Sequence, residues 1–520
     1  MAKICLCLTG KTLEQNLEIL EEYRGYIDMA ELRVDCLDPD ERFLIRSFPE
    51  KAGLPVILTI RRKADGGFFE DGEGSRVALL SKGIAFAEVD RRRNFAYIDI
   101  EEDLEVPGLE EVVRTFGTRI IRSYHNIEGT NDDIPGKLKK LLRVGDEIAK
   151  IAVTPHTMED VVKVYRAARE TRHTEKILLC MGHLGVNTRI LAAKIGSYLC
   201  YCSASERTGL HAAAPGQLDP KELVNLYRFR GIGKTTRVFG LAGFPLKVTN
   251  SPHIFNTAFN HEKINAVYLP FPSDSLKSFF DLAEEIGLAG AAITIPYKEE
   301  VISLLKDSSA GVKAAGACNT IVPVKAEPAP ERGTRDSRPG GWTGYNTDSA
   351  GFSGSLLSFI GKKHFHGLGI TVLGAGGAAG AVVSEISRLR GKCLILNRNQ
   401  ARAKELAAPY KYKWGGLDGR GLDMMDRYSD IIVQTTPVGT VPDIEADPFD
   451  LYRFTGRETV MDLIYRPERT AFLKRAEKAG CKVLNGFDML VRQATLQYQL
   501  FLSRDFPMEL IPRLEKIVNQ

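Results

Sequence analysis

Residues 370–403 read ITVLGAGGAAGAVVSEISRLRGKCLILNRNQARA, and this stretch decides the fold of the second half of the chain. An apolar run leads into a G-x-G-x-x-A pattern, and a helical pattern and a second apolar run, CLIL, follow it. A lone glycine pattern is a weak signal, but the strand–loop–helix–strand order strengthens it. We expect a Rossmann-type domain whose glycines admit a pyrophosphate to the start of a helix. The expected contacts are Gly374, Ala375, Gly376, Gly377 and Ala378.

The end of the second strand indicates which dinucleotide binds. A site for NAD has an acidic residue there to bind the ribose hydroxyls. This chain has Asn397 and Arg398 instead, with Arg402 one turn further on. Guanidinium groups attract a 2′-phosphate and can bind it bidentately, whereas a carboxylate would repel it. The sequence therefore predicts NADP as the cofactor.

The first half of the chain alternates short apolar runs with helix-like segments such as MEDVVKVYRAARE. This alternation predicts parallel strands, and eight repeats of it predict a closed (β/α)8 TIM barrel. The eight runs, which end at about residue 205, are ICLCLTG, MAELRVD, PVILTIR, FAYIDIE, RIIRSYH, IAKIAV, KILLCMG and YLCYCSA.

Polar residues lie near the carboxyl ends of these expected strands, where the catalytic residues of such barrels gather. Taken singly, each has an ordinary interpretation as a surface ion pair, a structural histidine or a lysine that reaches water. Together, three arginines, a histidine and a lysine suit an anionic substrate with a carbonyl group. A lysine in an apolar barrel loses its proton more readily and can form an imine with a ketone. The residues are Glu31, Arg33, Arg61, His125, Lys150, Arg189 and Gln217.

The composition is that of an ordinary globular chain, and 520 residues predict two to four domains. The net charge of +4, from 70 basic and 66 acidic residues, is too small to indicate a nucleic-acid partner. The nine cysteines show neither a disulfide nor a zinc pattern, which favours a reducing compartment. The N-terminus lacks an apolar signal segment, and no apolar stretch is long enough to span a bilayer. We expect a soluble, cytoplasmic protein without a metal ion.

Residues 238–350 hold strand ends rich in Pro, Asn and Gly, which place polar side chains at a cleft. Lys298 and Asp348 are the acid–base candidates there, because a lysine beside a carboxylate can protonate a carbonyl oxygen during reduction. Spacing alone favours a simple ion pair. Further on, KAEPAPERGTRDSRPGG (residues 325–341) predicts an extended hairpin loop.

Six ordered motifs within residues 4–220 resemble those of type I 3-dehydroquinate dehydratases. They are ELRVD, TIR, SYHN, KIAVTP, MGHLGVNTRI and APGQ. The resemblance implies dehydration of 3-dehydroquinate to 3-dehydroshikimate through a Schiff base on Lys150, with His125 as the proton acceptor and Glu31 orienting it. It also implies that Arg33, Arg61 and Arg189 hold the substrate carboxylate and hydroxyls, with Arg189 matching the carboxylate-binding arginine, and that Gln217 contacts the substrate.

Motifs from about Phe239 to Phe506 are similar to those of shikimate dehydrogenases. Among them are TIPYK ending at Lys298, NTD ending at Asp348, GAGGAA, TTPVG, DLIYRP and GFDMLVRQA. The resemblance implies NADPH-dependent reduction of 3-dehydroshikimate to shikimate, with Lys298 and Asp348 as the catalytic pair. It implies substrate contacts at Thr249, Ser251, Thr294, Asn319 and Gln493. It implies cofactor contacts at Thr436, Tyr465, Gly486 and Met489.

Both halves depart from their families at a few positions. Many dehydratase relatives have serine and glutamate at the positions of Ala213 and Asp65. In the second half, the unusual residues are Thr249, Ala292, Gln434 and Thr440. We expect altered affinity and no change of reaction.

The expected organisation is a barrel over residues 1–225, a linker over 226–237, a substrate-binding domain over 238–360 and a nucleotide domain over 361–486. Helices within 487–520 are expected to pack back on the substrate-binding domain. The two implied reactions are consecutive, as in known fused enzymes of the shikimate pathway, and no obligate protein partner is evident. Two alternatives stay open. Quinate is a possible second substrate, and a non-catalytic sensor of pathway metabolites is a weaker possibility because all four central acid–base residues are present.

Overall fold

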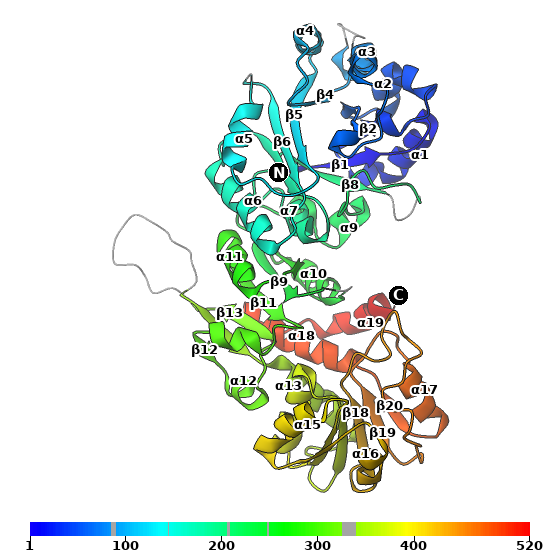
Figure 1. The fold of residues 1–520 in the computed structure, drawn as a ribbon, viewed down its shortest axis with the longest axis vertical. Coiled ribbons are helices and arrows are strands. Elements are labelled where there is room, and N and C mark those ends of the chain that lie inside the picture. Colours follow the sequence, from blue (N-terminus) through cyan, green and yellow to red (C-terminus); the bar gives the residue numbers. More distant parts are fainter. Residues whose placement is uncertain (85–89, 144, 205–208, 247–248, 325–339, 520) are drawn as a thin grey trace, which may run out of the picture. The chain divides into compact units, whose positions relative to one another are not determined.

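The computed structural model describes residues 1–84, 90–143, 145–204, 209–246, 249–324 and 340–519 (Figure 1). The chain divides into two compact units, residues 1–238 with 265–287 and residues 239–264 with 288–520. The hairpin loop expected at 325–341 lies almost wholly outside the described residues.

The first unit contains a nearly closed barrel of eight parallel strands, as the sequence predicted (Figure 1). Neighbouring strands pair in chain order from β1 to β7, and β8 pairs with β1. Between β7 and β8 a single bridge joins Lys176 to Ser197, and Tyr198 N donates to Lys176 O at 2.7 Å. The strands are β1 (Lys3–Leu8), β2 (Met29–Arg33), β3 (Val56–Thr59), β4 (Tyr97–Glu101), β5 (Arg119–Asn126), β6 (Ile148–Val153), β7 (Lys176–Cys180) and β8 (Leu199–Ser203).

The inner face of this barrel carries an apolar layer followed by a polar layer. Successive side chains of a strand point to opposite faces, so residues two apart share the interior. On β2 to β6, the buried apolar residues of the interior are Met29, Ile57, Tyr97, Ile121 and Ile148. Two residues further along the same strands come the buried polar residues Glu31, Thr59, Asp99, Ser123 and Lys150. The strand period therefore carries a polar group into the barrel from each of five neighbouring strands.

Helices follow most of these strands and are capped by nearby side chains. At the start of α6, Asp160 Oδ2 accepts from Thr157 N at 3.2 Å, and Asp160 N donates to Thr157 Oγ1 at 3.4 Å, which makes a capping box. Helix α11 also belongs to this unit and packs against α6. The helices are α1 (Leu13–Tyr23), α2 (Phe48–Ala52), α3 (Glu73–Ile84), α4 (Pro107–Thr115), α5 (Ile134–Leu141), α6 (Met158–Glu170), α7 (Val186–Ile190), α9 (Pro220–Asn225) and α11 (Leu276–Ile286), with strand β10 at Ala266–Pro272.

The second unit begins with five strands of a six-stranded mixed sheet, which are neighbours in the order β9–β11–β13–β14–β12. Strand β13 is antiparallel to β11 and β14, and β12 is parallel to β14. Helices α13 and α18 pack closely, since a Cβ atom at Gly351 would lie only 3.0 Å from Met489 O. The elements are β9 (Arg237–Gly243), α10 (Ser251–His261), β11 (Leu288–Ile293), β12 (Asp307–Ser308), α12 (Ala310–Ala315), β13 (Thr320–Pro323), β14 (Trp342–Tyr345), α13 (Thr347–Ile360), α18 (Phe487–Leu502) and α19 (Ile511–Asn519).

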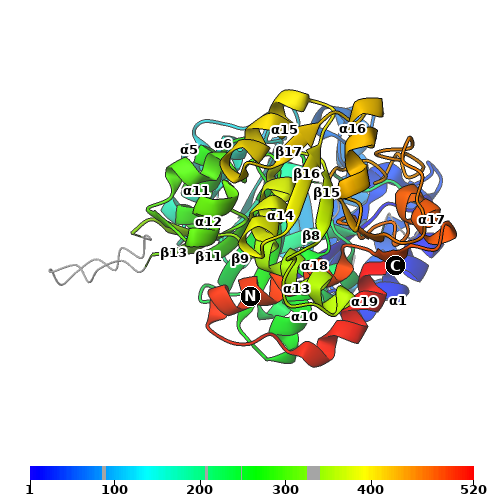
Figure 2. The same cartoon turned by 90° about the horizontal axis from the view of Figure 1, so that it is seen from below.

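A six-stranded parallel sheet completes this unit and confirms the prediction of a Rossmann-type fold. Its order is β17–β16–β15–β18–β19–β20, which in chain order is the 3-2-1-4-5-6 arrangement of dinucleotide-binding folds. Helix α14 packs against β15 and β16 (Figure 2). The elements are β15 (Gly369–Leu373), α14 (Gly377–Arg388), β16 (Lys392–Leu396), α15 (Gln400–Ala407), β17 (Lys413–Gly415), α16 (Gly419–Met424), β18 (Ile431–Gln434), β19 (Thr459–Asp462), α17 (Ala471–Lys478) and β20 (Lys482–Leu484).

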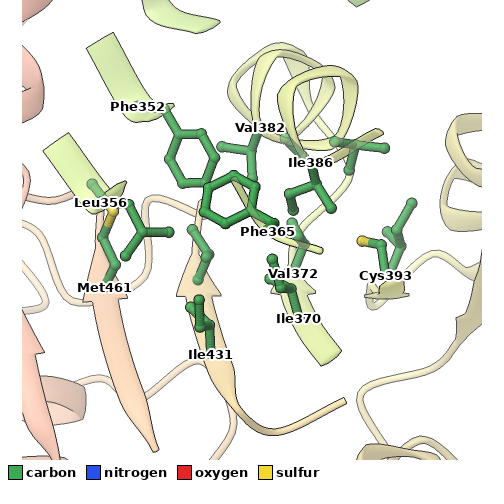
Figure 3. Close-up of a cluster of buried hydrophobic side chains, with 14 of the residues drawn as sticks. Phe352, Leu356, Phe365, Ile370, Val372, Val382, Ile386, Cys393, Ile431 and Met461 are labelled. Atoms are coloured by element: carbon green, nitrogen blue, oxygen red, sulfur yellow. The ribbon is translucent and has the colours of Figure 1, made fainter. Parts of the chain in front are cut away.

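Burial of apolar side chains on one face of this sheet holds α14 in place. Val382 and Ile386 of the helix gather with Ile370 and Val372 of the sheet and with Phe365 (Figure 3). All five are fully buried, and each contributes roughly 1.5–3 kcal/mol of transfer free energy. The core therefore fixes the start of α14, where the glycine motif lies.

All nine cysteines are free thiols, and all but Cys36 are buried. In the described part of the chain, no helix is long and apolar enough to cross a membrane. The same residues contain no cluster of three or more His, Cys, Asp or Glu side chains arranged to hold a metal ion.

Candidate active sites

A cavity of about 270 Å³ lies at the carboxyl ends of the barrel strands. It brings together all seven polar residues that the sequence analysis selected in this half, and Tyr201 and Met181 also line it. The seven are Glu31, Arg33, Arg61, His125, Lys150, Arg189 and Gln217.

Lys150 lies on β6 with its side chain buried inside the barrel. Its Nζ atom is 2.7 Å from Asp99 Oδ2, 4.0 Å from Glu31 Oε1 and 4.5 Å from the centre of the Tyr201 ring. These carboxylates and the aromatic face compensate a charge that would otherwise be costly to bury. The amine is thus held at one point in the wall of the cavity.

Asp99 is the centre of this charge network, and the sequence analysis did not single it out. Its carboxylate binds Lys150, accepts from Ser123 Oγ at 2.5 Å and lies 2.9 Å from Arg61 Nη2. Burial alone would raise the pKa of Asp99, but the charges of Arg61 and then Lys150 outweigh it and hold the pKa below its usual value. The sequence did contain a signal for Asp99. In YIDIE (residues 97–101), alternate residues of the strand share a face, which places Asp99 on the same face as the core residue Tyr97.

His125 stands in the same cavity as a neutral imidazole. Burial lowers its pKa well below the usual value, and the positive charges of Arg61 and Lys150 lower it further. Its Nδ1 atom is buried and has no hydrogen-bond partner in the described part of the chain. A neutral imidazole with a free ring nitrogen can accept a proton from a ligand.

Among the described residues, Glu31 makes no hydrogen bond to His125, although the family resemblance implied that Glu31 orients this histidine. Its Oε1 atom accepts from Thr59 Oγ1 at 2.9 Å, and its Oε2 atom accepts from the Cys7 thiol at 3.0 Å. The strand register explains the difference, because Cys7 on β1 is the direct Cα partner of Glu31 on β2.

The three arginines differ in whether they already have an acidic partner. Arg33 binds both oxygens of Asp35, at 2.9 and 2.7 Å, and Arg61 is paired with Asp99 and Glu101. Arg189 instead donates only to the backbone oxygens of Tyr201 and Pro215, at 3.4 and 3.2 Å, and pairs with no carboxylate among the described residues. Burial lowers the pKa of Arg189, a cost that an anionic ligand would offset.

In the second unit, the side chains of Lys298 and Asp348 meet beside the glycine motif. Lys298 Nζ is 2.6 Å from Asp348 Oδ2, and Asn319 Nδ2 donates to Asp348 Oδ1 at 2.7 Å. Asp348 stands in the first turn of α13, where negative charge is favoured. A Cβ atom at Gly377 would lie 3.5 Å from Lys298 Cδ, so the lysine lies next to the glycine motif.

The expected substrate contacts of this unit come from several elements. Thr249 Oγ1 lies 3.3 Å from Ser251 Oγ at the start of α10, and Thr294 directly follows β11. Asn319 and Gln493 converge on Thr347, whose Oγ1 atom accepts from Asn319 Nδ2 at 3.0 Å and donates to Gln493 Oε1 at 3.5 Å. Through Asn319, this hydroxyl and amide network joins the Lys298–Asp348 pair.

The glycine motif fits a dinucleotide pyrophosphate. Gly374 has a φ of +117°, and a Cβ atom there would lie 2.4 Å from Thr435 Oγ1, so only glycine fits. At Gly376 nothing lies within 4 Å of the Cβ position, which leaves open space at the N-terminus of α14. Exposed backbone amides at a helix start bind phosphate groups well. Ala375 and Ala378 flank these positions in the same loop.

Beyond β16, the side chains expected to bind the 2′-phosphate are accessible. Arg398 and Arg402 are exposed, and neither pairs with a carboxylate among the described residues. Asn397 is partly buried, and its Nδ2 atom donates to Asn399 O at 2.9 Å. Two guanidinium groups without an acidic partner among the described residues, one just after β16 and one in α15, favour a phosphorylated ribose.

The remaining cofactor candidates lie in the loops after β18 and β19 and at the start of α18. Gln434, a departure from the family pattern, closes the first loop: it donates to Thr436 O and Val438 O, both at 3.0 Å, and accepts from Thr436 N at 2.5 Å. A Cβ atom at Gly486 would lie 2.0 Å from Leu463 O, so this position requires glycine. Burial raises the pKa of Tyr465, and Met489 is packed into the core.

Two family models match this chain. The model for "Type I 3-dehydroquinase" matches residues 4–234, and that for the "Shikimate dehydrogenase substrate binding domain" matches residues 241–321. A shikimate dehydrogenase (NADP(+)) of Desulforamulus reducens is 34% identical over 297 residues, which are 54% of this chain and 94% of the relative. A chloroplastic bifunctional 3-dehydroquinate dehydratase/shikimate dehydrogenase of Arabidopsis thaliana is 29% identical over 93% of this chain and 79% of its own length. The chain belongs to this bifunctional family.

Two of the solved structures that match this chain differ in how much of it they cover. The dehydroquinate dehydratase and shikimate dehydrogenase part of the S. pombe protein AroM covers 100% of this chain and 98% of its own, at 22% identity and a TM-score of 0.43. A shikimate 5-dehydrogenase of Thermus thermophilus, in complex with NADP(H) and shikimate, covers 54% of this chain and 99% of its own at 26% identity and a TM-score of 0.45.

The dehydratase departures from the family pattern also have a place in the structure. Asp65 lines the barrel cavity, and its Oδ2 atom accepts from Arg62 Nε at 2.7 Å. Ala213 lines the same cavity, and its carbonyl accepts from Arg33 Nη1 at 3.2 Å. In the dehydrogenase half, Ala292 is buried in β11 and Thr440 Oγ1 donates to Pro437 O at 2.9 Å.

Proposed function

We propose that this chain dehydrates 3-dehydroquinate to 3-dehydroshikimate in the barrel and reduces 3-dehydroshikimate to shikimate in the second unit. The observation that carries the proposal is the presence of two separate lysine-centred sites in one chain. One is Lys150 against Asp99 in the barrel cavity, and the other is Lys298 against Asp348 beside the glycine motif.

In the barrel, Lys150 gives up one proton and its amine attacks the C3 ketone; that proton returns to the carbinolamine hydroxyl, which leaves as water and gives an iminium. His125 removes the C2 proton, and the electron pair of that C–H bond flows into the iminium to give an enamine. The enamine electrons return as the C1–O bond breaks, and the proton on His125 leaves with the hydroxyl as water. Hydrolysis of the imine releases the product and restores Lys150.

Ligand recognition in this site divides among the remaining polar groups. Arg189 binds the substrate carboxylate, which supplies the anion it lacks among the described residues. Arg33, Arg61 and Gln217 contact ring hydroxyls, while Asp99 keeps Arg61 and Lys150 in place. Glu31 acts beside Lys150 rather than on His125.

In the second unit, Lys298 protonates the carbonyl oxygen of 3-dehydroshikimate, while Asp348 orients its ammonium group and Asn319 holds Asp348. When bound, NADPH supplies the hydride. Thr249, Ser251, Thr294, Asn319 and Gln493 hold the substrate. The cofactor contacts are Gly374, Ala375, Gly376, Gly377, Ala378, Asn397, Arg398, Arg402, Thr436, Tyr465, Gly486 and Met489.

The domain bounds given for the sequence remain our proposal, as does a cytoplasmic location. Nine free thiols, of which all but Cys36 are buried, suit a reducing compartment. We propose small-molecule substrates only, with no nucleic-acid, membrane or obligate protein partner.

A coupled assay tests the function directly. Purified full-length protein, given 3-dehydroquinate and NADPH without another enzyme, should consume NADPH and accumulate shikimate. The measurements are the loss of absorbance at the NADPH band and the identity of the product by mass spectrometry and chromatography. No turnover with 3-dehydroquinate, combined with turnover of added 3-dehydroshikimate, would show that the barrel is inactive. If quinate were offered separately and were the only substrate that the protein converted, the substrate assignment would be overturned.

The choice of cofactor is tested by Arg398→Ala. Removing a charge-assisted contact to the 2′-phosphate should weaken NADP binding by about 10-fold or more, and NAD binding should change little. The dissociation constants of both nucleotides are measured by titration. Arg388→Ala is a control, because Arg388 is exposed in the same unit and pairs with Glu385. An equal loss for both nucleotides would contradict the assignment.

A further inference from the structure

Cys7 lies beneath the dehydratase cavity, between two residues that line it. Its side chain is buried in the interior of the barrel. The thiol donates to Glu31 Oε2 at 3.0 Å, and Gln217 Nε2 donates to Cys7 Sγ at 3.2 Å. Glu31 and Gln217 line the cavity, whereas Cys7 does not. The thiol therefore touches the two residues from behind the surface that meets the ligand.

Counting donors decides which way the amide of Gln217 faces. A thiol has one proton to donate, and its sulfur can accept. Burial, followed by the charge of Glu31, raises the pKa of Cys7 well above its usual value, so the thiol keeps that proton. Because the thiol donates this proton in its hydrogen bond to Glu31 Oε2, the sulfur can act toward Gln217 only as an acceptor. The neighbouring amide must then present its NH₂ group to Cys7.

The other end of the same amide has no partner among the described residues. Gln217 Oε1 is buried and accepts no hydrogen bond from any of them. An unsatisfied buried acceptor is costly and is satisfied when a donor arrives. A carboxylate cannot supply that donor, but a hydroxyl can. The orientation set at Nε2 thus makes Gln217 a receptor for a hydroxyl group.

We propose that Cys7 is a positioning residue of the dehydratase site, which fixes the amide of Gln217 so that its oxygen accepts from a substrate hydroxyl. The proposal rests on the role of Gln217 as a substrate contact. It assigns to Cys7 an effect on substrate binding through Gln217, separate from any effect on Lys150 chemistry through Glu31.

The test compares Cys7→Ala, Cys7→Ser and Cys5→Ala in the full chain. Serine preserves one donor and one acceptor, and alanine removes both. Cys5 is the matched control, because it is two residues earlier on β1, is equally buried in the barrel core and makes no side-chain hydrogen bond to Gln217. Steady-state kinetics of dehydration are measured, with the reductase activity of each variant showing that the chain is folded.

We expect Cys7→Ala to raise the KM for 3-dehydroquinate by about 3- to 10-fold with kcat nearly unchanged. Cys7→Ser should restore the KM to within about 2-fold of the original, and Cys5→Ala should leave it unchanged. In a Gln217→Ala background, Cys7→Ala should add little, because the two residues act as one unit.

Other outcomes separate the possible failures. A fall in kcat at constant KM would mean that Cys7 acts through Glu31, and an equal KM increase in Cys5→Ala would mean a general packing effect. Full additivity with Gln217→Ala would also overturn the proposal. If Gln217→Ala itself leaves the KM unchanged, the assignment of Gln217 fails. If Gln217→Ala raises the KM and Cys7→Ala does not, only the role of Cys7 fails.

Discussion

Lys150→Ala is expected to abolish dehydration, with a loss in kcat on the order of 10⁴-fold or more, because Lys150 is the only lysine among the described residues that line the cavity. The reduction of 3-dehydroshikimate should stay largely intact, since that site lies in the other unit. Both activities are measured separately on the same preparation. Loss of both would contradict two independent sites.

Lys176→Met provides a matched control for this substitution. Lys176 is the other buried lysine of the barrel strands and lies on β7, where its Nζ atom donates to Thr171 O at 2.8 Å. Burial lowers its pKa to about 8, so burial alone does not distinguish the two lysines. We expect Lys176→Met to retain dehydration. Borohydride added with 3-dehydroquinate should reduce the imine to a stable adduct on the peptide that contains Lys150. An adduct on another peptide would contradict the assignment of the imine to Lys150.

Asp348→Asn is expected to lower the kcat for reduction by about 10²- to 10⁴-fold and to leave dehydration unchanged. The amide keeps the shape of the side chain but removes the charge that lies 2.6 Å from Lys298 Nζ. The new amide has two orientations. In one, its oxygen faces Lys298 and its NH₂ group faces the NH₂ donor of Asn319. In the other, its oxygen faces Asn319 and turns away from Lys298. The measurement is the initial rate of NADPH oxidation with saturating 3-dehydroshikimate.

The same substitution at Asp447 separates catalysis from stability. Asp447 is an ion-paired aspartate in the same unit, with Oδ2 at 2.9 Å from Arg475 Nε. Asp447→Asn should leave kcat within about 2-fold of the original. If both variants lost activity equally, the Lys298–Asp348 pair would be a structural ion pair, as spacing alone favoured.

Much of the fold could be predicted because it follows from short-range patterns. The eight apolar runs become the eight barrel strands, since the pattern of buried residues along each run depends on the run itself. The glycine motif becomes a turn and a helix start because only glycine can adopt the backbone conformation of Gly374. The same reasoning brought Lys150, His125 and Arg189 to one cavity, because parallel strands end at one edge.

The choice of partner inside the site could not be predicted in this way. Asp99 binds Lys150, and Cys7 rather than His125 binds Glu31, because of the register of strands that are far apart in the sequence. The family resemblance implied that Arg189 binds the carboxylate, but the residues themselves did not distinguish it from Arg33 and Arg61. In the structure, only Arg189 of the three has no acidic partner among the described residues. Nothing local to an arginine indicates which carboxylate will be buried beside it.

The sequence by itself determined the two folds, the order of the chemical groups along the chain and the family resemblance, because strand period, glycine conformation and motif spacing are local properties. Only the tertiary structure decided which charges neutralise each other, which imidazole is neutral and which way the amide of Gln217 faces. The physical reason is that burial makes each of these choices depend on every polar group within hydrogen-bond reach. In a barrel, those groups come from different strands.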